Sequence, residues 1–291
     1  MANLFKNKKF RLLLKIAVTV IALYFVYNKV DINELLNTIA HIKWVYFILA
    51  ILAFLVSKII SSVRLNAYFK CVDIHISERQ NWRLYMLGMF YNLFLPGGIG
   101  GDGYKVYILN QKFSTPVKQL VQATILDRLS GLFAILVLAL VCINWIDFGL
   151  TWLPMVANIA IPVGTVVYYF GLKILFKTFT PVFTRTTLLS MLVQIGQVLA
   201  AYFILLAINV EAGYTAYIFI FLAASLSIVF PFSIGGLGLR EYVAVEMANQ
   251  GYFEVDKGLA VAMASLFFVV TALVSLLGVY YVWFKNQLWK K

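Results

Sequence analysis

The sequence predicts an all-α polytopic membrane protein with about six full spans and two re-entrant, glycine-interrupted hairpins arranged as an inverted repeat. Three observations lead to this fold class. Of the 291 residues, 63% are hydrophobic and only 12% are charged, whereas soluble domains average about 45–50% and about 25%. The hydrophobic residues form runs long enough to cross a bilayer, and two glycine-rich segments resemble each other. We therefore treat residues 1–291 as a single integral-membrane domain.

Apolar runs define the spans, because a helix needs about 20 apolar residues to cross the hydrocarbon core. The first run follows a basic tail and has no small-residue cleavage site after it, so we expect an uncleaved anchor. Two further apolar stretches, 83–96 and 214–231, lead directly into glycine-rich segments. The predicted full spans are roughly 10–28, 43–62, 121–145, 152–172, 187–208 and 258–284.

The distribution of basic residues predicts that the two glycine-interrupted stretches turn back rather than cross. If 83–96 returns to the cytoplasmic side and 214–231 to the outer side, 18 Lys and Arg residues lie inside and three outside. If both stretches cross, 12 lie inside and nine outside. Basic residues normally gather on the cytoplasmic side. We therefore expect the re-entrant arrangement, with both termini cytoplasmic.

Several function classes are excluded by what the sequence contains. The net charge of +12 does not indicate a nucleic-acid partner, because basic residues of membrane proteins face anionic headgroups. The only histidines and cysteines, His41, His75, Cys71 and Cys142, have no metal-ligand spacing, so neither a metal site nor a cofactor is expected. No GxxxxGK[ST] loop is present, which argues against direct use of ATP.

The glycine-rich segments form an internal repeat. Residues 96–105 read PGGIGGDGYK and residues 231–240 read PFSIGGLGLR, with five identical positions and a final cation, Lys105 or Arg240. The topology places the two copies on segments that start from opposite sides. This predicts an inverted repeat with halves at roughly 43–150 and 186–284, a plan that transporters use with the substrate site near the midplane.

Glycine runs interrupt helices, and non-helical backbone at membrane depth must face protein or a water-filled cavity. We expect the two breaks to present free N–H groups and a cation to one cavity, where a lipid phosphate is the natural ligand. The alternative is that the glycines only permit close helix packing.

Charged residues at membrane depth complete the predicted site. Asp127 and Arg128 are adjacent in ILDRLSGL, about 100° apart on a helix, so each needs its own partner. Lys58 is expected to extend to the interface, and for Arg64 interface and interior are both open. Arg240 and Glu241 either join the site or form a local pair. The candidate headgroup-binding residues are Arg64, Gly100, Gly101, Asp102, Lys105, Asp127, Arg128, Gly235, Gly236, Arg240 and Glu241.

These motifs resemble the flippase-like transmembrane region of lysylphosphatidylglycerol synthases, which also occurs as stand-alone proteins. The resemblance rests on LPGGIGGDGYK (95–105), ILDRLSGL (125–132), FPFSIGGLGLRE (230–241) and the arginine of SSVRL (61–65), and extends to Lys285. It implies a lipid-translocation or lipid-handling role in a bacterial cytoplasmic membrane. The full-length synthases have a soluble aminoacyl-transfer domain after this region, and the printed chain ends at Lys291, so lysyl transfer is not expected.

Three functions remain open. The leading hypothesis is a lipid flippase that moves an anionic phospholipid or a polyprenyl-phosphate-linked lipid between leaflets, and the chain is then not an enzyme. The second is a membrane enzyme acting on a lipid phosphate, with Asp102 or Asp127 as base. The third is a non-transporting partner of a lipid-modifying enzyme, with the basic loop 64–83 as docking surface. The oligomeric state is not predicted.

Overall fold

The computed structural model of the chain describes residues 42–94, 100–226, 239–249 and 255–289. All regular secondary structure within these ranges is helical. Short 3-10 helices lie at Ile143–Trp145, Lys177–Val182 and Lys285–Gln287. The α-helices are α3 (Trp44–Lys70), α4 (Glu78–Phe94), α5 (Gly100–Phe113), α6 (Val117–Cys142), α7 (Leu153–Leu175), α8 (Phe183–Ala207), α9 (Tyr214–Leu226), α10 (Leu239–Asn249), α11 (Lys257–Leu276) and α12 (Val279–Trp283).

Within the described residues, five helical segments are long and apolar enough to cross a membrane. They overlap the spans predicted at 43–62, 121–145, 152–172, 187–208 and 258–284, so the all-helical membrane fold is confirmed there. The predicted first span, 10–28, lies outside the described residues. The five segments are Trp44–Lys70, Val117–Trp145, Leu153–Leu175, Lys177–Ala207 and Lys257–Trp283.

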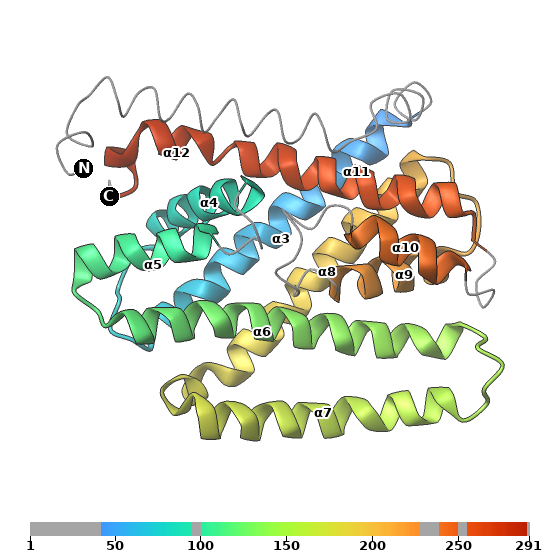
Figure 1. Cartoon of the computed structure of the whole chain (residues 1–291), viewed down its shortest axis with the longest axis horizontal. Helices are drawn as coiled ribbons and strands as arrows, with labels where there is room; N and C mark the ends of the chain where they lie inside the picture. Colours follow the sequence, from blue (N-terminus) through green and yellow to red (C-terminus); the bar gives the residue numbers. More distant parts are fainter. Residues whose placement is uncertain (1–41, 95–99, 227–238, 250–254, 290–291) are drawn as a thin grey trace.

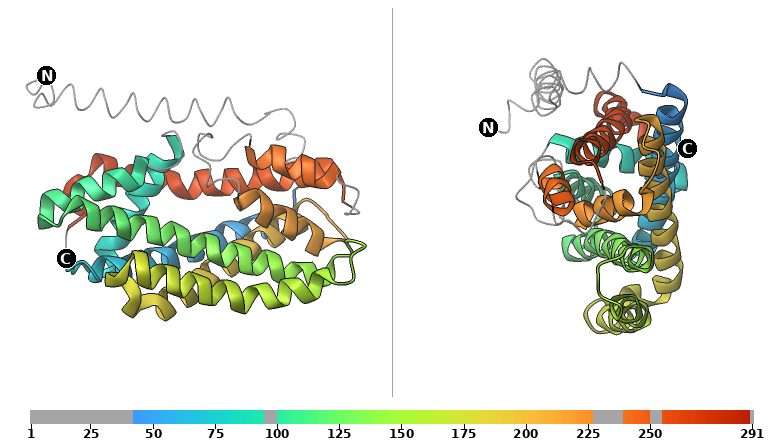
Figure 2. Two further views of the ribbon diagram at one scale, coloured as in Figure 1. Left: turned by 60° about the horizontal axis from the view of Figure 1, so that its bottom comes forward. Right: turned by 90° about the vertical axis from the view of Figure 1, so that its right-hand side faces the viewer.

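The long helices surround two pairs of shorter ones (Figure 1). α6 and α7 run antiparallel along one edge, and α11 continues into α12 along the opposite edge. α3 and α8 pack against each other along most of their length and form one wall of the bundle (Figure 2). The α4–α5 pair and the α9–α10 pair occupy the space between, near opposite ends of α6.

The four inner helices are all shorter than the bilayer core, and α4 and α9 are the longer member of each pair. α4 has 17 residues and α9 has 13, which correspond to about 26 Å and about 20 Å, whereas the hydrocarbon core is about 30 Å thick. α4 ends at Phe94 and α5 begins at Gly100, while α9 ends at Leu226 and α10 begins at Leu239. Both glycine-rich segments therefore separate two helices.

The start of α4 and the end of α5 lie at the same end of the bundle. Gln80 near the start of α4 donates from Nε2 to the carbonyl of Trp289 (3.0 Å). The ammonium of Lys112, near the end of α5, lies 3.6 Å from the centre of the Trp289 ring. Arg83 also donates to the carbonyl of Gln287. The C-terminal segment therefore holds both ends of this helix pair together.

The α9–α10 pair has its open end at the other end of the bundle. Ile220 of α9 packs against Ala244 and Ala248 of α10 in one buried cluster. Phe148, in the connection between α6 and α7, contacts Phe219 of α9 edge to face, with ring centres 5.7 Å apart. The start of α9 and the end of α10 thus lie where α6 ends, opposite the α4–α5 connection to α6 (Figure 1).

Glycines allow close contact between helices at two positions. A Cβ placed on Gly196 of α8 would lie 3.0 Å from the Cβ of Ser57 on α3. A Cβ on Gly278, between α11 and α12, would overlap the carbonyl oxygen of Met86 on α4. Membrane helices associate through such close backbone approach because lipid gives no hydrophobic driving force between them.

Candidate functional site

A cavity of about 350 Å³ lies between the two short helix pairs, bordered also by α3, α6 and α8. Seven of the 18 described lining residues are charged, and they come from α3, α5, α6 and α10. Most of the charged residues that the sequence singled out therefore meet here. The charged residues of the lining are Lys58, Arg64, Asp102, Lys105, Asp127, Arg128 and Arg240.

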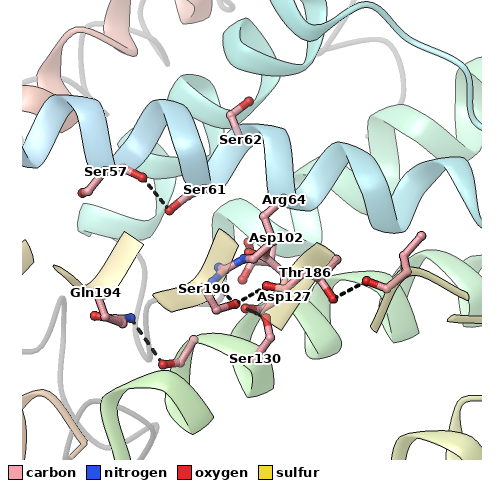
Figure 3. A network of polar contacts seen from close by, with 12 residues as sticks. Ser57, Ser61, Ser62, Arg64, Asp102, Asp127, Ser130, Thr186, Ser190 and Gln194 are labelled. Carbon is pink, nitrogen blue, oxygen red and sulfur yellow. Dashed lines mark hydrogen bonds and ion pairs between the residues drawn. The ribbon is translucent and has the colours of Figure 1, made fainter. Parts of the chain in front are cut away.

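Arg64 joins three helices from the wall of the cavity. It is buried on α3 with 5% of its surface exposed, so the interior alternative holds. Its Nε donates to Oδ1 of Asp127 on α6 (2.8 Å), and its Nη1 donates to Oγ of Ser190 on α8 (2.9 Å) (Figure 3). A buried ion pair needs such additional hydrogen bonds to offset the desolvation of its charges.

Asp102 is shared by two cations. Its Oδ1 lies 2.7 Å from Nζ of Lys105, one turn further along α5. Its Oδ2 accepts from Nε of Arg128 on α6 (2.6 Å). The stem of Lys105 passes over α4 at Gly88, where an added Cβ would lie 3.0 Å from Cδ and Cε of the lysine. Asp102 thus fixes α5 against α6.

The neighbours Asp127 and Arg128 have separate partners, as their angular separation predicts. Asp127 meets Arg64, and Arg128 meets Asp102. Both carboxylates of the cavity therefore already interact with cations of the chain. With five cations and two carboxylates, the described lining has a formal positive excess of three.

Lys58 lines the interior cavity, whereas the sequence led us to expect a side chain that extends to the interface. The residue lies at the middle of α3, fifteenth of 27 residues, and lines the cavity. Its Nζ lies 4.5 Å from the centre of the Phe54 ring. A lysine at the middle of a membrane helix costs about 2.5–3.5 kcal/mol on insertion scales, which usually indicates a function.

Arg240 is the corresponding cation of the second repeat. Its guanidinium carbon lies 5.1 Å from the ring centre of Phe267 and 5.9 Å from that of Phe221, within the range of cation–π contacts. Arg240 also lines the cavity, together with Lys105 of the first repeat. Three other predicted site residues, Gly235, Gly236 and the side chain of Glu241, lie outside the described part of the chain.

Gly101 of the first glycine motif acts in helix packing. Gly100 is the first residue of α5. The N–H of Gly101 donates to Oδ1 of Asn92 on α4 (2.7 Å), so it is not a free donor for a ligand, contrary to our expectation. A Cβ on Gly101 would overlap the carbonyl oxygen of Gly88. For Gly101 the close-packing alternative is therefore correct.

Uncharged polar residues of the cavity were missed by the sequence analysis. Gln194 and Gln197 of α8 line the cavity, and Ser190 bonds Arg64. The three stand at i, i+4 and i+7 of an otherwise apolar span, a spacing that places them on one helix face. That pattern is the signal that would have found them. Tyr85 of α4 also contacts the site, with its ring centre 5.2 Å from Nζ of Lys105.

Apolar spans around a cation-rich interior cavity define a multi-pass helical membrane protein. The model of one family, described as the lysylphosphatidylglycerol synthase TM region, matches residues 12–278. Because the match covers most of the chain, the protein belongs to this family, whose membrane domain is tied to lipid metabolism or transport. No curated protein matches the chain in sequence.

Proposed function

We propose that this protein is a lipid flippase that moves an anionic phospholipid or polyprenyl-phosphate-linked lipid between leaflets. The observation that supports this most is the cavity, in which five cations and two ion-paired carboxylates face a space of about 350 Å³. This volume is at the small end of ligand pockets and suits a headgroup whose acyl chains stay in the lipid. The positive excess attracts an anion and opposes a cationic headgroup.

The arrangement of the short helices suggests how a headgroup reaches the cavity from either leaflet. We infer that α4–α5 is re-entrant from one side and α9–α10 from the other. Each pair contributes a cation of the repeat to the lining, Lys105 from α5 and Arg240 from α10. Relative movement of such repeats around a fixed midplane site is a common basis of alternating access.

The exposed basic residues suggest the orientation. At the end formed by the last turns of α3, α5 and α7, Lys70, Lys112 and Lys173 are exposed, and Lys118, Lys177 and Arg185 lie nearby. At the opposite end, Lys43 and Lys257 are accompanied by exposed Asp147, Glu211 and Asp256. By the positive-inside rule, the first end is cytoplasmic, in a bacterial inner membrane, and the C-terminus is on this side. We place the N-terminus there as well.

The two other hypotheses are less well supported by the site. In the enzyme hypothesis, Asp102 or Asp127 has to be available as a base, but both carboxylates form ion pairs with cations of the chain. In the docking hypothesis, Arg64 cannot contact a partner protein because it is buried. Arg83 already donates a hydrogen bond to the C-terminal segment of the chain. Both observations favour transport over catalysis or recruitment.

The test is a scrambling assay in proteoliposomes that contain a fluorescent phosphatidylglycerol. A membrane-impermeant quencher reaches only the outer leaflet unless the protein exchanges lipids. We expect wild type to expose the inner-leaflet fraction without ATP, and both Lys105→Ala and Arg240→Ala to slow this exchange at least about tenfold. The matched control is Lys43→Ala, which removes an exposed lysine outside the cavity.

Equal exchange rates in wild type and both cavity variants would contradict the cavity as the transport site. No exchange by wild type, with either phosphatidylglycerol or a polyprenyl phosphate, would contradict the flippase proposal. In that case, loss of binding to a lipid-modifying enzyme when Lys70 and Arg79 in the loop 64–83 are replaced would favour the partner role instead.

A further inference from the structure

We propose that Lys58 makes the cavity a site for phosphate monoesters, in which the phosphate group bears two negative charges, and that Lys58 is the residue that determines this specificity. The inference rests on the proposed lipid-handling function and narrows its substrate class. It would favour a lipid phosphate monoester, such as a polyprenyl phosphate, over the phosphodiesters of common phospholipids.

The first argument is the position of Lys58. It lies at the middle of α3 and lines the cavity. Among the side chains that the structure describes, no carboxylate lies within ion-pair distance of its Nζ. Its Nζ lies 4.5 Å from the centre of the Phe54 ring, a cation–π contact. A charge placed at this depth is normally matched by a partner or a ligand.

The second argument is the charge balance of the cavity. Arg64 is matched by Asp127, and Lys105 and Arg128 share Asp102. These contacts fix the helices and leave both carboxylates engaged. A phosphodiester, with one negative charge, offsets only part of the positive excess in the lining. A monoester offsets one charge more, and charges interact strongly where water is scarce.

The third argument is chemical geometry. A lysine ammonium is a compact charge with three N–H donors. A phosphate monoester offers three terminal oxygens, and a diester only two. Lys58 on α3 and Arg240 on α10 line the same cavity from different helices, and we infer that both contact the one bound phosphate group. The guanidinium of Arg240 supplies planar donors that suit two phosphate oxygens, and in this proposal Lys58 binds the third.

The test compares binding of three probes to purified protein in detergent at pH 7: short-chain phosphatidic acid, short-chain phosphatidylglycerol and inorganic phosphate. At this pH a phosphate monoester has lost most of its second proton, since its second pKa is about 6. We expect wild type to bind phosphatidic acid at least about tenfold more tightly than phosphatidylglycerol. Inorganic phosphate should bind more weakly than phosphatidic acid, because it lacks the lipid anchor.

In Lys58→Gln the preference should fall to about twofold or less through weaker binding of phosphatidic acid, with phosphatidylglycerol little changed. Lys58→Arg should retain the preference, and Lys43→Gln, at an exposed lysine, is the matched control. Lys58→Met gives a second test if the glutamine variant does not fold. Thermal unfolding without ligand shows whether each variant is intact.

Two results would overturn the inference. One is a wild type without preference between the two lipids, and the other is equal weakening of both lipids in Lys58→Gln. If inorganic phosphate binds as tightly as phosphatidic acid, the ligand of the cavity is free phosphate and not a lipid headgroup. The proposed flippase function is judged separately: failure to exchange lipids with an intact Lys58-dependent preference contradicts transport only, and exchange without the preference contradicts this inference only.

Discussion

At the scale of single residues, the pair of Arg64 and Asp127 illustrates how a membrane interior tolerates charge. Their side chains are 6% and 12% exposed, and the guanidinium has a second partner in Ser190. The pair links α3, α6 and α8. Removing one member leaves the other charge buried without compensation, which is far more costly than losing the pair's net contribution.

We therefore predict that Asp127→Ala lowers the free energy of unfolding by about 3–5 kcal/mol. The double variant Arg64→Met with Asp127→Leu should recover most of this loss, because no isolated charge remains. Lys70→Ala, which removes only an exposed pair with Glu78, is the control, with an expected change under about 1 kcal/mol. Denaturant titration in detergent measures all three. A loss for Asp127→Ala no larger than that for Lys70→Ala would contradict the prediction.

We predict that alanine substitutions at Gly101 and Gly103 of the first glycine motif change the stability of the protein in opposite directions. A Cβ on Gly101 would overlap the backbone oxygen of Gly88, whereas a Cβ on Gly103 would meet no heavy atom within 4 Å. Gly101→Ala should lower stability by about 1–3 kcal/mol through overpacking. Gly103→Ala should raise it by up to about 1 kcal/mol, because alanine favours the helix.

Thermal unfolding of the two alanine variants in detergent provides this comparison, with each serving as the control for the other. A similar shift in the same direction would mean that the glycines of the motif act through backbone freedom rather than through the contact between α4 and α5.

At the scale of helices, the sequence allowed prediction of spans but not of contacts. A helix needs about 20 apolar residues to cross the hydrocarbon core, so the five described candidate spans overlap predicted ones, although their ends differ. Which cation meets which carboxylate depends on the rotation and tilt of each helix. Arg64 and Asp127 are separated by 63 positions, and no spacing within one helix indicates their contact.

Lys58 shows how an error in a helix end changes a functional interpretation. The predicted span 43–62 places Lys58 four residues from its end, within reach of the interface. The helix continues to Lys70, because residues 65–69 are buried against the rest of the bundle. The same residue thus lies at the middle of a longer helix and lines the cavity.

The re-entrant topology of α4–α5 is tested by cysteine accessibility. In a variant with Cys71→Ser and Cys142→Ser, single cysteines are introduced at two exposed positions, His75 just before α4 and Gln111 in the last turn of α5. We expect a membrane-impermeant maleimide to reach both from the same side of the membrane. If α4 crosses the bilayer, the two positions will be labelled from opposite sides.

The same experiment applies to α9–α10. Cysteines at Glu211 and Lys257, both exposed, should be labelled from one side, opposite to the side of His75 and Gln111. Labelling of all four positions from a single side would contradict the opposite orientation of the two helix pairs and, with it, the alternating-access model. The cysteine-free variant is the control for background labelling.

At the scale of the whole molecule, hydrophobic side chains are found both inside and outside. Phe54, Phe90 and Phe267 are buried in the bundle, while the outward face of α7 exposes valine, isoleucine and phenylalanine. Only Ala157 and Leu172 are buried on this helix. In a soluble protein such a surface would cause aggregation, whereas in a membrane it is the natural contact with lipid. This distribution explains why hydrophobicity alone identified the class of protein but not its interior.

The exposed face of α7 gives a prediction that distinguishes lipid contact from contact with a protein partner. Val163 lies at the middle of α7 and is 55% exposed. Val163→Lys should cost about 2.5–3.5 kcal/mol of membrane insertion, seen as a reduced alkali-resistant fraction in membranes. Leu175→Lys, at the end of the same helix, should insert normally, because the ammonium reaches the interface. Normal insertion of both variants would mean that position 163 faces water or a polar partner surface. The helix that contacts lipid on this side of the bundle would then be α6 and not α7.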